Sequence, residues 1–265
     1  MRTTRLKDFV HINPTVRLAK AVEYPFVSMD AITPGRRYVE APGTRASGGG
    51  ARFCGGDTLF ARITPCLENG KIAQFKAAST QPAFGSTEYW IFRARENVSD
   101  PAYVFYLGTS KIVRGPAEKS LSGASGRQRA DLAAIEDLEV PAPDLPTQRR
   151  IASILSAYDD LIENNTRRIA ILEEMAGRIY EEWFVRYRFP GYEQVKMVES
   201  DLGPIPEGWS VLPATLAVTI NPKVRIPKEG LKPFVPMGSL SEGSMLISNV
   251  EHREGNSGSV SSPDR

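Results

Sequence analysis

The chain repeats part of its own sequence at a fixed offset of 208 residues. Residues 12–32 and residues 220–240 align without a gap and share ten identities in twenty-one positions. Solenoid repeats recur every ~20–50 residues, so an offset this long indicates a duplicated domain with another segment between the two copies. The identical residues, numbered in the first copy, are Ile12, Asn13, Pro14, Val16, Arg17, Lys20, Pro25, Phe26, Val27 and Met29.

The offset also predicts how the chain is divided. We expect a first domain over residues 1–146, a linker over 191–202 and an incomplete second copy over 203–265. The final residue, Arg265, corresponds to Asp57 of the first copy, so we expect most of a second core to be missing. Because the last stretch is rich in glycine and serine, we expect residues 203–265 to be loosely packed.

A heptad pattern fills the segment between the two copies. Apolar residues recur every seven positions in two sets three residues apart, from the candidate N-cap Thr147 to Arg188. Pro190 and Gly191 end the pattern. We predict a spacer helix over residues 147–190, about 60 Å long, that pairs with another helix. The predicted pairing residues are Ile151, Leu155, Tyr158, Ile162, Asn165, Ile169, Leu172, Ala176, Ile179 and Trp183.

Two alternatives for this helix stay open at the level of sequence. An ordinary helix can pack its apolar side against its own domain, although globular helices average about 11–12 residues. Asn165 would fix the register of a helix pair if it were buried, and it would otherwise point to water.

The first domain has the sequence of a mixed α+β fold. Short apolar runs such as residues 58–63 and 88–92 alternate with glycine, proline and polar turns, as in a set of short strands. A helix is predicted from Asp100 to Arg114, with Asp100 as its cap and proline at its first position. We therefore expect an α+β domain, then a long coiled-coil-type helix, then a partial second copy of the domain.

The positive charge of the chain gathers in the first domain. Residues 1–146 carry 19 lysines and arginines against 15 acidic residues, residues 147–190 carry 7 of each, and residues 191–265 carry 7 against 9. A basic excess in one domain is what a nucleic-acid-binding protein needs, although an excess of four is modest.

Two loops of this domain have the residue types that contact DNA. The turn at residues 85–87 offers hydroxyl groups and backbone amides for phosphate oxygens, and the segment 122–129 combines flexible glycines with two arginines and a glutamine. The predicted DNA contacts are Arg62, Lys71, Ser86, Thr87, Ser122, Gly123, Ser125, Gly126, Arg127, Gln128 and Arg129. Further candidates are Arg36, Arg37, Arg45 and Arg52, for which a solvated surface charge is the alternative.

The sequence predicts neither a catalytic nor a metal site. Asp57 and Glu68 with Lys71 resemble a metal-dependent nuclease motif, but two residues separate Glu68 from Lys71 where that motif has one. The two histidines lie in unrelated contexts, and no glycine-rich phosphate or dinucleotide motif occurs. We expect no cofactor, no membrane span, and reduced thiols at Cys54 and Cys66 in the cytoplasm.

Four stretches resemble the specificity subunits of type I restriction–modification enzymes. The most specific runs from Val140 to Ile162 and includes LPTQRRIASIL, at the start of the predicted helix. The helix exit IYEEWF at residues 179–184 is similar to the same family, as are GPIPEGW at 203–209 and GDTLFARITPCLENGK at 56–71.

The resemblance implies a non-catalytic protein that recognises double-stranded DNA. Members have two target-recognition domains separated by two antiparallel helices, and each domain recognises one half of a split target. Methyltransferase subunits dock along the helices and a motor–nuclease subunit joins them. The S-adenosylmethionine, ATP and magnesium sites belong to those partners.

This chain has only one complete domain and one spacer helix, so pairing of that helix with a second copy of the chain is one expectation. The alternatives are an inactive truncated product, a coiled-coil adaptor that binds no DNA, and a nuclease or methyltransferase fused to such a domain.

Overall fold

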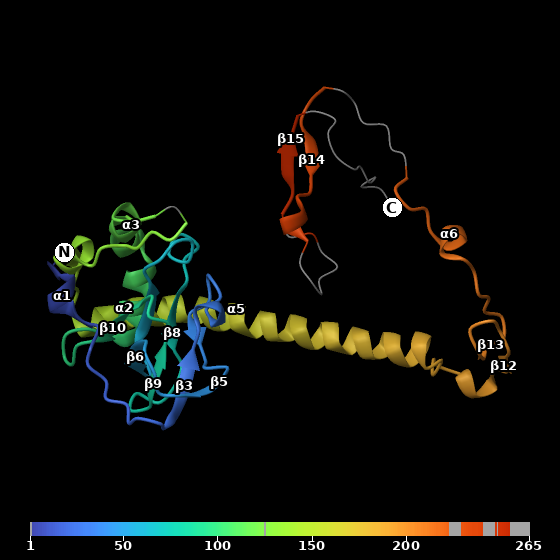
Figure 1. The fold of residues 1–265 in the computed structure, drawn as a ribbon, viewed down its shortest axis with the longest axis horizontal. Coiled ribbons are helices and arrows are strands. Elements are labelled where there is room, and N and C mark those ends of the chain that lie inside the picture. The colour runs from blue at the N-terminus through green and yellow to red at the C-terminus, as the bar shows by residue number, and fades with distance from the viewer. Residues whose placement is uncertain (1, 125, 223–228, 241–246, 248, 255–265) are drawn as a thin grey trace. The chain divides into compact units, whose positions relative to one another are not determined.

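The computed structural model describes residues 2–124, 126–222, 229–240, 247 and 249–254. It divides into two units, residues 1–175 and 176–265, which are described separately below. The predicted α+β class and the long helix are confirmed (Figure 1). Among the described residues, no helix is both long enough and apolar enough to cross a membrane.

A five-stranded sheet forms the centre of the first unit. Its strand order is β2-β10-β7-β8-β4. The central strand β7 pairs antiparallel with both β10 and β8. All four of its residues are buried because both faces of the sheet are covered. The strands are β2 (Val10–Ile12), β4 (Tyr38–Val39), β7 (Thr58–Ala61), β8 (Ile72–Phe75) and β10 (Tyr89–Ala94).

A second sheet of four strands covers one face of the first. Its order is β5-β3-β9-β6, with β3 and β9 parallel. Between the two sheets lies a core cluster that contains Val27, Phe53, Leu59 and Ile91, all 1 % exposed or less. The strands are β3 (Glu23–Val27), β5 (Gly43–Ala46), β6 (Ala51–Cys54) and β9 (Pro82–Gly85).

Helices cover the other face of the five-stranded sheet. Phe60, Trp90 and Phe92 point to this side, and the Phe60 and Trp90 rings stack 5.8 Å apart. Asp100 caps α2 with its carboxylate, as predicted, but the helix ends at Thr109 and a second helix begins at Lys111. The elements on this side are β1 (Thr3–Arg5), α1 (Leu6–Phe9), α2 (Pro101–Thr109), α3 (Lys111–Lys119), α4 (Ala133–Glu136) and β11 (Glu139–Pro141).

The predicted spacer helix is present with shifted ends. α5 runs over Leu145–Tyr180 and continues into the π-helical turn η2 (Glu181–Val185). The expected cap at Thr147 is wrong, because the Asp144 carboxylate accepts a hydrogen bond from the Thr147 backbone amide at 3.0 Å. Thr147 therefore lies inside the first turn. The far end also stops short of Arg188, because the π turn and the positive φ of 56° at Tyr187 break the helical backbone.

The second unit continues from α5 with short elements. These are η3 (Tyr192–Gln194), β12 (Met197–Val198), β13 (Ile205–Pro206), α6 (Ala214–Ala217), β14 (Lys232–Phe234), η4 (Met237–Ser239) and β15 (Glu251–Arg253). Among the described residues from 203 onward, only Ile205, Pro206 and Ser239 are buried. Residues 255–265 of the predicted loosely packed tail lie outside the described residues.

In its described residues, this unit repeats several backbone features of the first copy at the offset of 208. α6 stands where α1 stands, and η4 stands where η1 (Met29–Ala31) stands. Asn221 has a φ of 51° and its equivalent Asn13 a φ of 49°, a left-handed conformation that asparagine adopts more readily than most residues.

The hairpin of the second copy reproduces both the pairing and a side-chain contact of the first. β14 pairs with β15 in the register of β3 and β5, moved by 208 residues. The guanidinium carbon of Arg253 lies 4.0 Å from the centre of the Phe234 ring. The equivalent distance from Arg45 to Phe26 is 4.1 Å. The local sequence therefore specifies this hairpin in both places.

Candidate nucleic-acid interface

The topology of the two sheets brings the predicted contact loops to one end of the first unit. β3 and β9 run parallel and end at Val27 and Gly85, while β7 ends at Ala61, where β10 begins. Two loops therefore begin at neighbouring strand ends: the turn at 85–88 and the segment that starts at Arg62. The Arg62 amide donates to the Glu88 carbonyl at 3.0 Å, which joins the two loops.

The segment 122–129 folds back onto this end as a small loop of its own. Ser122 and Arg129 form an isolated bridge, and Arg129 forms another with Ile63. The Gln128 carbonyl accepts from the Thr64 amide at 2.9 Å, and the Thr64 hydroxyl accepts from the Gln128 amide at the same distance. The loop is thus fixed at its base by backbone contacts.

The tip of this loop is open to solvent. Ser122, Gly123, Gly126 and Arg127 are exposed, and both glycines have positive φ values, 120° and 78°. The Arg127 side chain has neither a hydrogen bond nor an ion pair within the described part of the chain. Ser125, another predicted contact, lies outside the described residues. An exposed guanidinium beside two exposed glycines suits either a phosphate or a base edge.

Glu88 links the two arginines at the base of the loop. Its carboxylate accepts from the Arg62 Nε at 3.2 Å and from the Arg129 guanidinium at 2.6 to 3.1 Å. The hydrogen bond from Arg129 holds the pKa of Glu88 below its usual value near 4.5, and partial burial opposes the shift. Arg62 and Arg129 are therefore partly neutralised, which leaves Arg127 and Gln128 as the freer contact groups.

The remaining predicted contacts differ in their accessibility. Thr87 is exposed, whereas the Ser86 hydroxyl accepts from the Glu88 amide at 3.2 Å. The Lys71 ammonium group donates to the Met29 carbonyl at 3.0 Å, and its side chain is only 18 % exposed. The Lys71 ammonium group is therefore engaged by the segment that follows β3. We call the set Arg62, Ser86, Thr87, Ser122, Gly123, Gly126, Arg127, Gln128 and Arg129 the recognition surface.

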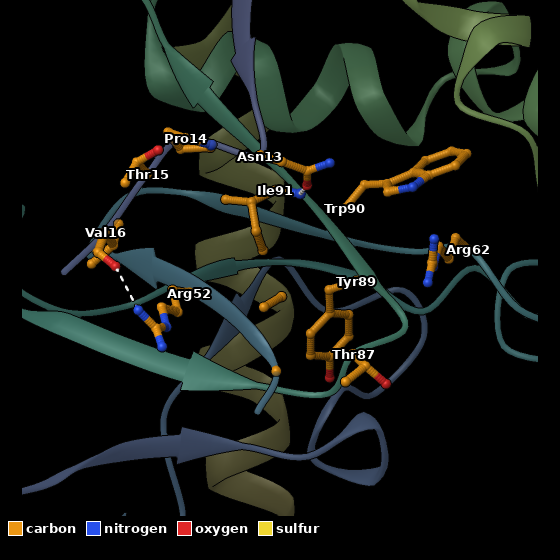
Figure 2. Close-up of a pocket in the computed structure, with 12 residues that line it drawn as sticks. Asn13, Pro14, Thr15, Val16, Arg52, Arg62, Thr87, Tyr89, Trp90 and Ile91 are labelled. Carbon is orange, nitrogen blue, oxygen red and sulfur yellow. Dashed lines mark hydrogen bonds between the residues drawn. The ribbon is translucent and has the colours of Figure 1, made fainter. Parts of the chain in front are cut away.

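An open groove of about 440 Å³ begins at this surface. Figure 2 shows Arg62, Thr87 and Tyr89 on one part of its lining and Pro14, Thr15 and Val16 on another. The Arg52 guanidinium also lines it and donates to the Val16 carbonyl at 3.4 Å. Two arginines at an open groove favour an anionic ligand over a neutral one.

Two arginines that the sequence offered as DNA contacts hold the helix instead. Arg37 is buried and donates to the Gln74 side chain at 2.9 and 3.1 Å, to the Tyr106 hydroxyl at 3.3 Å, and to the Ser156 hydroxyl on α5. Arg36 donates to the Thr166 hydroxyl at 2.7 Å. Both side chains are committed to the junction between domain and helix.

Sequence reasoning missed a stripe of α5 that contacts the domain. Its members recur three or four residues apart and are the only residues of 147–175 that are buried or half-buried. The amide of Gln148, wholly buried, accepts from the Asp100 amide at 2.8 Å and donates to the Val98 and Pro143 carbonyls. We call this set the anchoring stripe: Gln148, Ala152, Ser156, Asp159, Glu163 and Thr166.

The Tyr106 hydroxyl extends this contact by donating to the Asp159 carboxylate. Burial, with the Asp159 hydrogen bond, raises the pKa of Tyr106 to about 12. The 3-4 spacing of small and polar residues was the available sequence signal, but polar helix residues are ordinarily assigned to solvent.

The ten predicted pairing residues form a separate, exposed stripe that we call the seam. All ten are exposed, and Ile154, Leu161 and Met175 widen the stripe with 53 to 56 % exposure. Because successive helix residues are about 100° apart, the seam and the anchoring stripe lie roughly a third of a turn from each other. Domain contacts therefore leave the seam uncovered, and the alternative that this apolar side packs on its own domain is wrong for residues 151–175.

The residues of the suspected nuclease motif have structural roles. Asp57, 2 % exposed, accepts from the Arg93 guanidinium at 2.6 and 2.8 Å and from the Cys54 amide at 2.7 Å. The Glu68 carbonyl accepts from Arg114 at 2.6 Å. Within the described ranges, no group of three or more histidine, cysteine or acidic residues is placed to hold a metal ion.

Comparison with known proteins identifies the family of the chain. Residues 1–174 match the family described as type I restriction modification DNA specificity domain. Over 110 residues the chain is 34 % identical to the type I restriction enzyme MjaIX specificity subunit of Methanocaldococcus jannaschii, a match that covers 41 % of this chain and 25 % of that protein. It is 29 % identical over 117 residues to the EcoAI specificity subunit of Escherichia coli, covering 43 % and 20 %.

A solved structure is also similar. The HsdS subunit from Thermoanaerobacter tengcongensis superposes with a TM-score of 0.49 and 19 % identity, over 79 % of this chain and 52 % of that chain. The matches thus span about half of that subunit and a fifth to a quarter of the two curated relatives.

Proposed function

Because this chain belongs to the type I restriction modification DNA specificity domain family, we propose that it is the DNA-recognition component of a type I restriction–modification complex. Its first domain recognises one part of a double-stranded DNA target. It needs no cofactor and carries out no chemistry, since methylation and cleavage belong to partner subunits. The chain binds its DNA target in the cytoplasm.

The recognition surface is the observation that carries this proposal. It places an unpaired arginine and a half-buried glutamine on a glycine-containing loop that is fixed at its base. Arginine and glutamine form bidentate hydrogen bonds with guanine and adenine, respectively, in the major groove. A rigid base with an adaptable tip is suited to contact base edges without a large loss of conformational entropy.

The seam supports the proposed partners. An apolar stripe that continues for many turns and is exposed along the helix needs a partner helix to cover it. We propose that this partner is a second spacer helix, supplied by another copy of the chain in an antiparallel pair. Methyltransferase subunits then dock along the paired helices, and the motor–nuclease subunit joins through them. Such a pair would carry two identical recognition domains and select a symmetric, interrupted site.

The seam alone would also support a second function, a coiled-coil adaptor that binds no DNA. The two functions differ in what the first domain does. An adaptor would keep its helix partners after any substitution in the recognition surface, and its first domain would not select DNA sequences.

Selection of bound duplexes from a randomised pool tests the proposal. The full chain should enrich a defined sequence, and Gln128→Ala together with Arg127→Ala should change or abolish the enriched bases. Lys111→Ala, which removes an exposed cation from α3 outside the surface, is the matched control and should enrich the original sequence. Failure of the unaltered chain to enrich any sequence would favour the adaptor.

Light scattering tests the helix pair separately. At micromolar concentration the chain should have the mass of a dimer, and Leu155→Glu with Ile162→Glu should return it to a monomer without changing its circular dichroism. A monomeric unaltered chain would remove the homodimer from the proposal and leave the DNA-recognition part intact.

A further inference from the structure

The four-stranded sheet of the first unit has an outer face that is aromatic and basic. Side chains alternate between the two faces of a strand, so the burial of Val27 and Phe53 in the core directs their strand neighbours outward. Phe26 and Phe84 are paired on this outer face, with ring centres 5.0 Å apart. Arg45 lies over the Phe26 ring at 4.1 Å.

Arg52 belongs to the same outer face, because it pairs with Phe84 across β6 and β9. The one acidic residue of β3, Glu23, alternates to the opposite face, where it accepts from the Thr44 hydroxyl at 2.7 Å. The charge on the outer face of β3, β5 and β6 is therefore positive.

The segment after β2 borders this face and adds two more cations. The Tyr24 hydroxyl accepts from the Ala19 amide at 3.1 Å, and the Ala19 carbonyl accepts from the Ser47 hydroxyl at 2.6 Å. Arg17 and Lys20, on either side of Ala19, are exposed, and neither side chain has a hydrogen bond or ion pair within the described ranges. We call Arg17, Lys20, Arg45 and Arg52 the basic patch.

The duplication shows which of these cations have been kept. Eleven of the twenty-one aligned positions differ between the two copies, yet Arg17 and Lys20 recur as Arg225 and Lys228. Arg45 recurs as Arg253, which stacks on Phe234 in the same way. Arg225 and Lys228 lie outside the described residues.

Packing does not explain why Arg17 and Lys20 are identical in the two copies. Val16 and Val27 are shared by the two copies and are buried in the first, and Asn13 is shared and has a positive φ. Arg17 and Lys20 are solvent-exposed, and the described residues offer neither side chain a hydrogen bond or an ion pair that would hold the fold together. The second copy is even more basic in this segment, because Thr15 and Tyr24 are replaced there by lysines.

We infer that the basic patch of the first domain binds DNA phosphates without regard to base sequence, mainly through Arg17, Lys20 and Arg45, which recur in the second copy, whereas Arg52 is replaced there by a valine at position 260. Two recognition domains that select different bases still share one ligand, the phosphate backbone, so the cations that contact it are the ones expected to be common to both copies. The inference rests on the proposed function.

The position of the patch agrees with this role. The open groove beside the recognition surface is lined by Arg62 and Thr87 at one part and by Val16 and Arg52 at another (Figure 2). Arg17 follows Val16 directly in the chain. A duplex that contacts the recognition surface with its base edges can therefore place a neighbouring stretch of backbone along the patch.

The test is the salt dependence of DNA binding by the full chain with Arg17→Ala and Lys20→Ala combined. Binding to the selected duplex and to a scrambled duplex is measured by fluorescence anisotropy at several salt concentrations. Each phosphate contact contributes about 0.9 to the slope of log K against log salt. The double variant should therefore lose about 2 in slope and weaken on both duplexes by the same factor.

Two controls separate this effect from a general loss of charge or of specificity. Lys111→Ala with Lys119→Ala removes the same charge from α3 and should leave the slope unchanged. Gln128→Ala should reduce the preference for the selected duplex and keep the slope. Thermal melting of the double variant should match that of the unaltered chain, because both side chains are exposed.

Three results would overturn the inference. An unchanged slope and affinity would show that the patch does not contact DNA. Unchanged DNA binding with loss of co-purifying methyltransferase subunits would assign the patch to a protein surface. If the unaltered chain binds neither duplex, both the proposed function and the inference fail. This result differs from an unchanged slope in the double variant, because it is already visible in the unaltered chain.

Discussion

The two copies of the repeated segment share a short helix, a left-handed asparagine and a hairpin in their described residues, and differ in their surroundings. In the first copy, α1 buries Leu6 and Phe9, each 1 % exposed, and Val10 after it is equally buried. In the second copy, α6 has alanines at the equivalent positions, and Val218, which is equivalent to Val10, is 57 % exposed. The short helix, the left-handed asparagine and the hairpin form in both.

The difference teaches that turns and hairpins are specified locally, whereas burial depends on distant parts of the chain. The first copy becomes a domain because strands β7 to β10 and helices α2 to α4 supply apolar partners for its opening segment. The described part of the second copy has no such partners, and its apolar residues Val218, Ile220 and Met237 remain exposed. The proposed function depends on the same distant strands, because the loops between them form the recognition surface.

The largest expected effect is the loss of stability when a phenylalanine of the first domain's core is removed, compared with removal of a phenylalanine of the second copy. Phe60 is fully buried and packs between Trp90 and Phe92, so Phe60→Ala should lower the free energy of unfolding of the first domain by about 3–5 kcal/mol. Phe234→Ala in the second copy should change it by less than about 0.5 kcal/mol. Urea denaturation followed by near-ultraviolet circular dichroism measures both. Equal losses would contradict the separation of the copies.

The next effect comes from the ion pair of Asp57 and Arg93. The Asp57 side chain is 2 % exposed and that of Arg93 31 %, so Arg93→Leu would leave a buried carboxylate with one hydrogen-bond donor. We expect a loss of about 2–3 kcal/mol, below the value for a fully buried pair because water reaches Arg93. Adding Asp57→Asn should recover part of the loss in the same denaturation experiment. No recovery would mean that the pair is not the cause.

A closely matched pair of substitutions uses one residue type at equivalent positions. Val27 is 0 % exposed between the sheets, and its equivalent Val235 is 37 % exposed. Val27→Ala should cost about 1–2 kcal/mol from the two lost methyl groups and the space that they leave. Val235→Ala should cost less than about 0.5 kcal/mol. A cost for Val235 that matches Val27 would show that the second copy has a core of its own.

The smallest effect is a pH dependence at the recognition surface. The pKa of Glu88 is lowered by Arg129, so its contribution to stability is present above about pH 4.5 and is lost as the pH falls through the lower pKa of the folded state. Arg129→Ala should move the Glu88 carboxyl titration upward toward 4.5 in a carbon-detected NMR experiment. An unmoved titration midpoint would mean that Arg129 is not what holds the loop to Glu88.

Sequence and structure agree where periodicity or repetition provides the signal. The duplication, the long helix and the Asp100 cap of α2 all follow from patterns that need only neighbouring residues or a fixed offset. The exposed seam follows in the same way, since seven-residue spacing alone predicts it.

The parts that could not be predicted depend on tertiary contacts. Short strands that are buried on both faces, such as β7, show no alternation of apolar and polar residues. Their sequence therefore does not indicate whether they belong to one sheet or to two. Gln148 and Arg37 are buried because each finds hydrogen-bond partners far away in the sequence. The contact loops were predicted, but the pairing of Arg62 and Arg129 through Glu88 could be found only once their strands were placed together.

Mapping of methylated bases in cells that produce this chain with the methyltransferase subunits proposed as its partners tests the central claim most directly. The account predicts that methylation occurs at one defined sequence, and that Arg127→Ala with Gln128→Ala changes the specified bases while Lys111→Ala does not. Methylation that is absent, or whose sequence stays the same after the Arg127 and Gln128 substitutions, would contradict the claim that this domain recognises DNA through that loop.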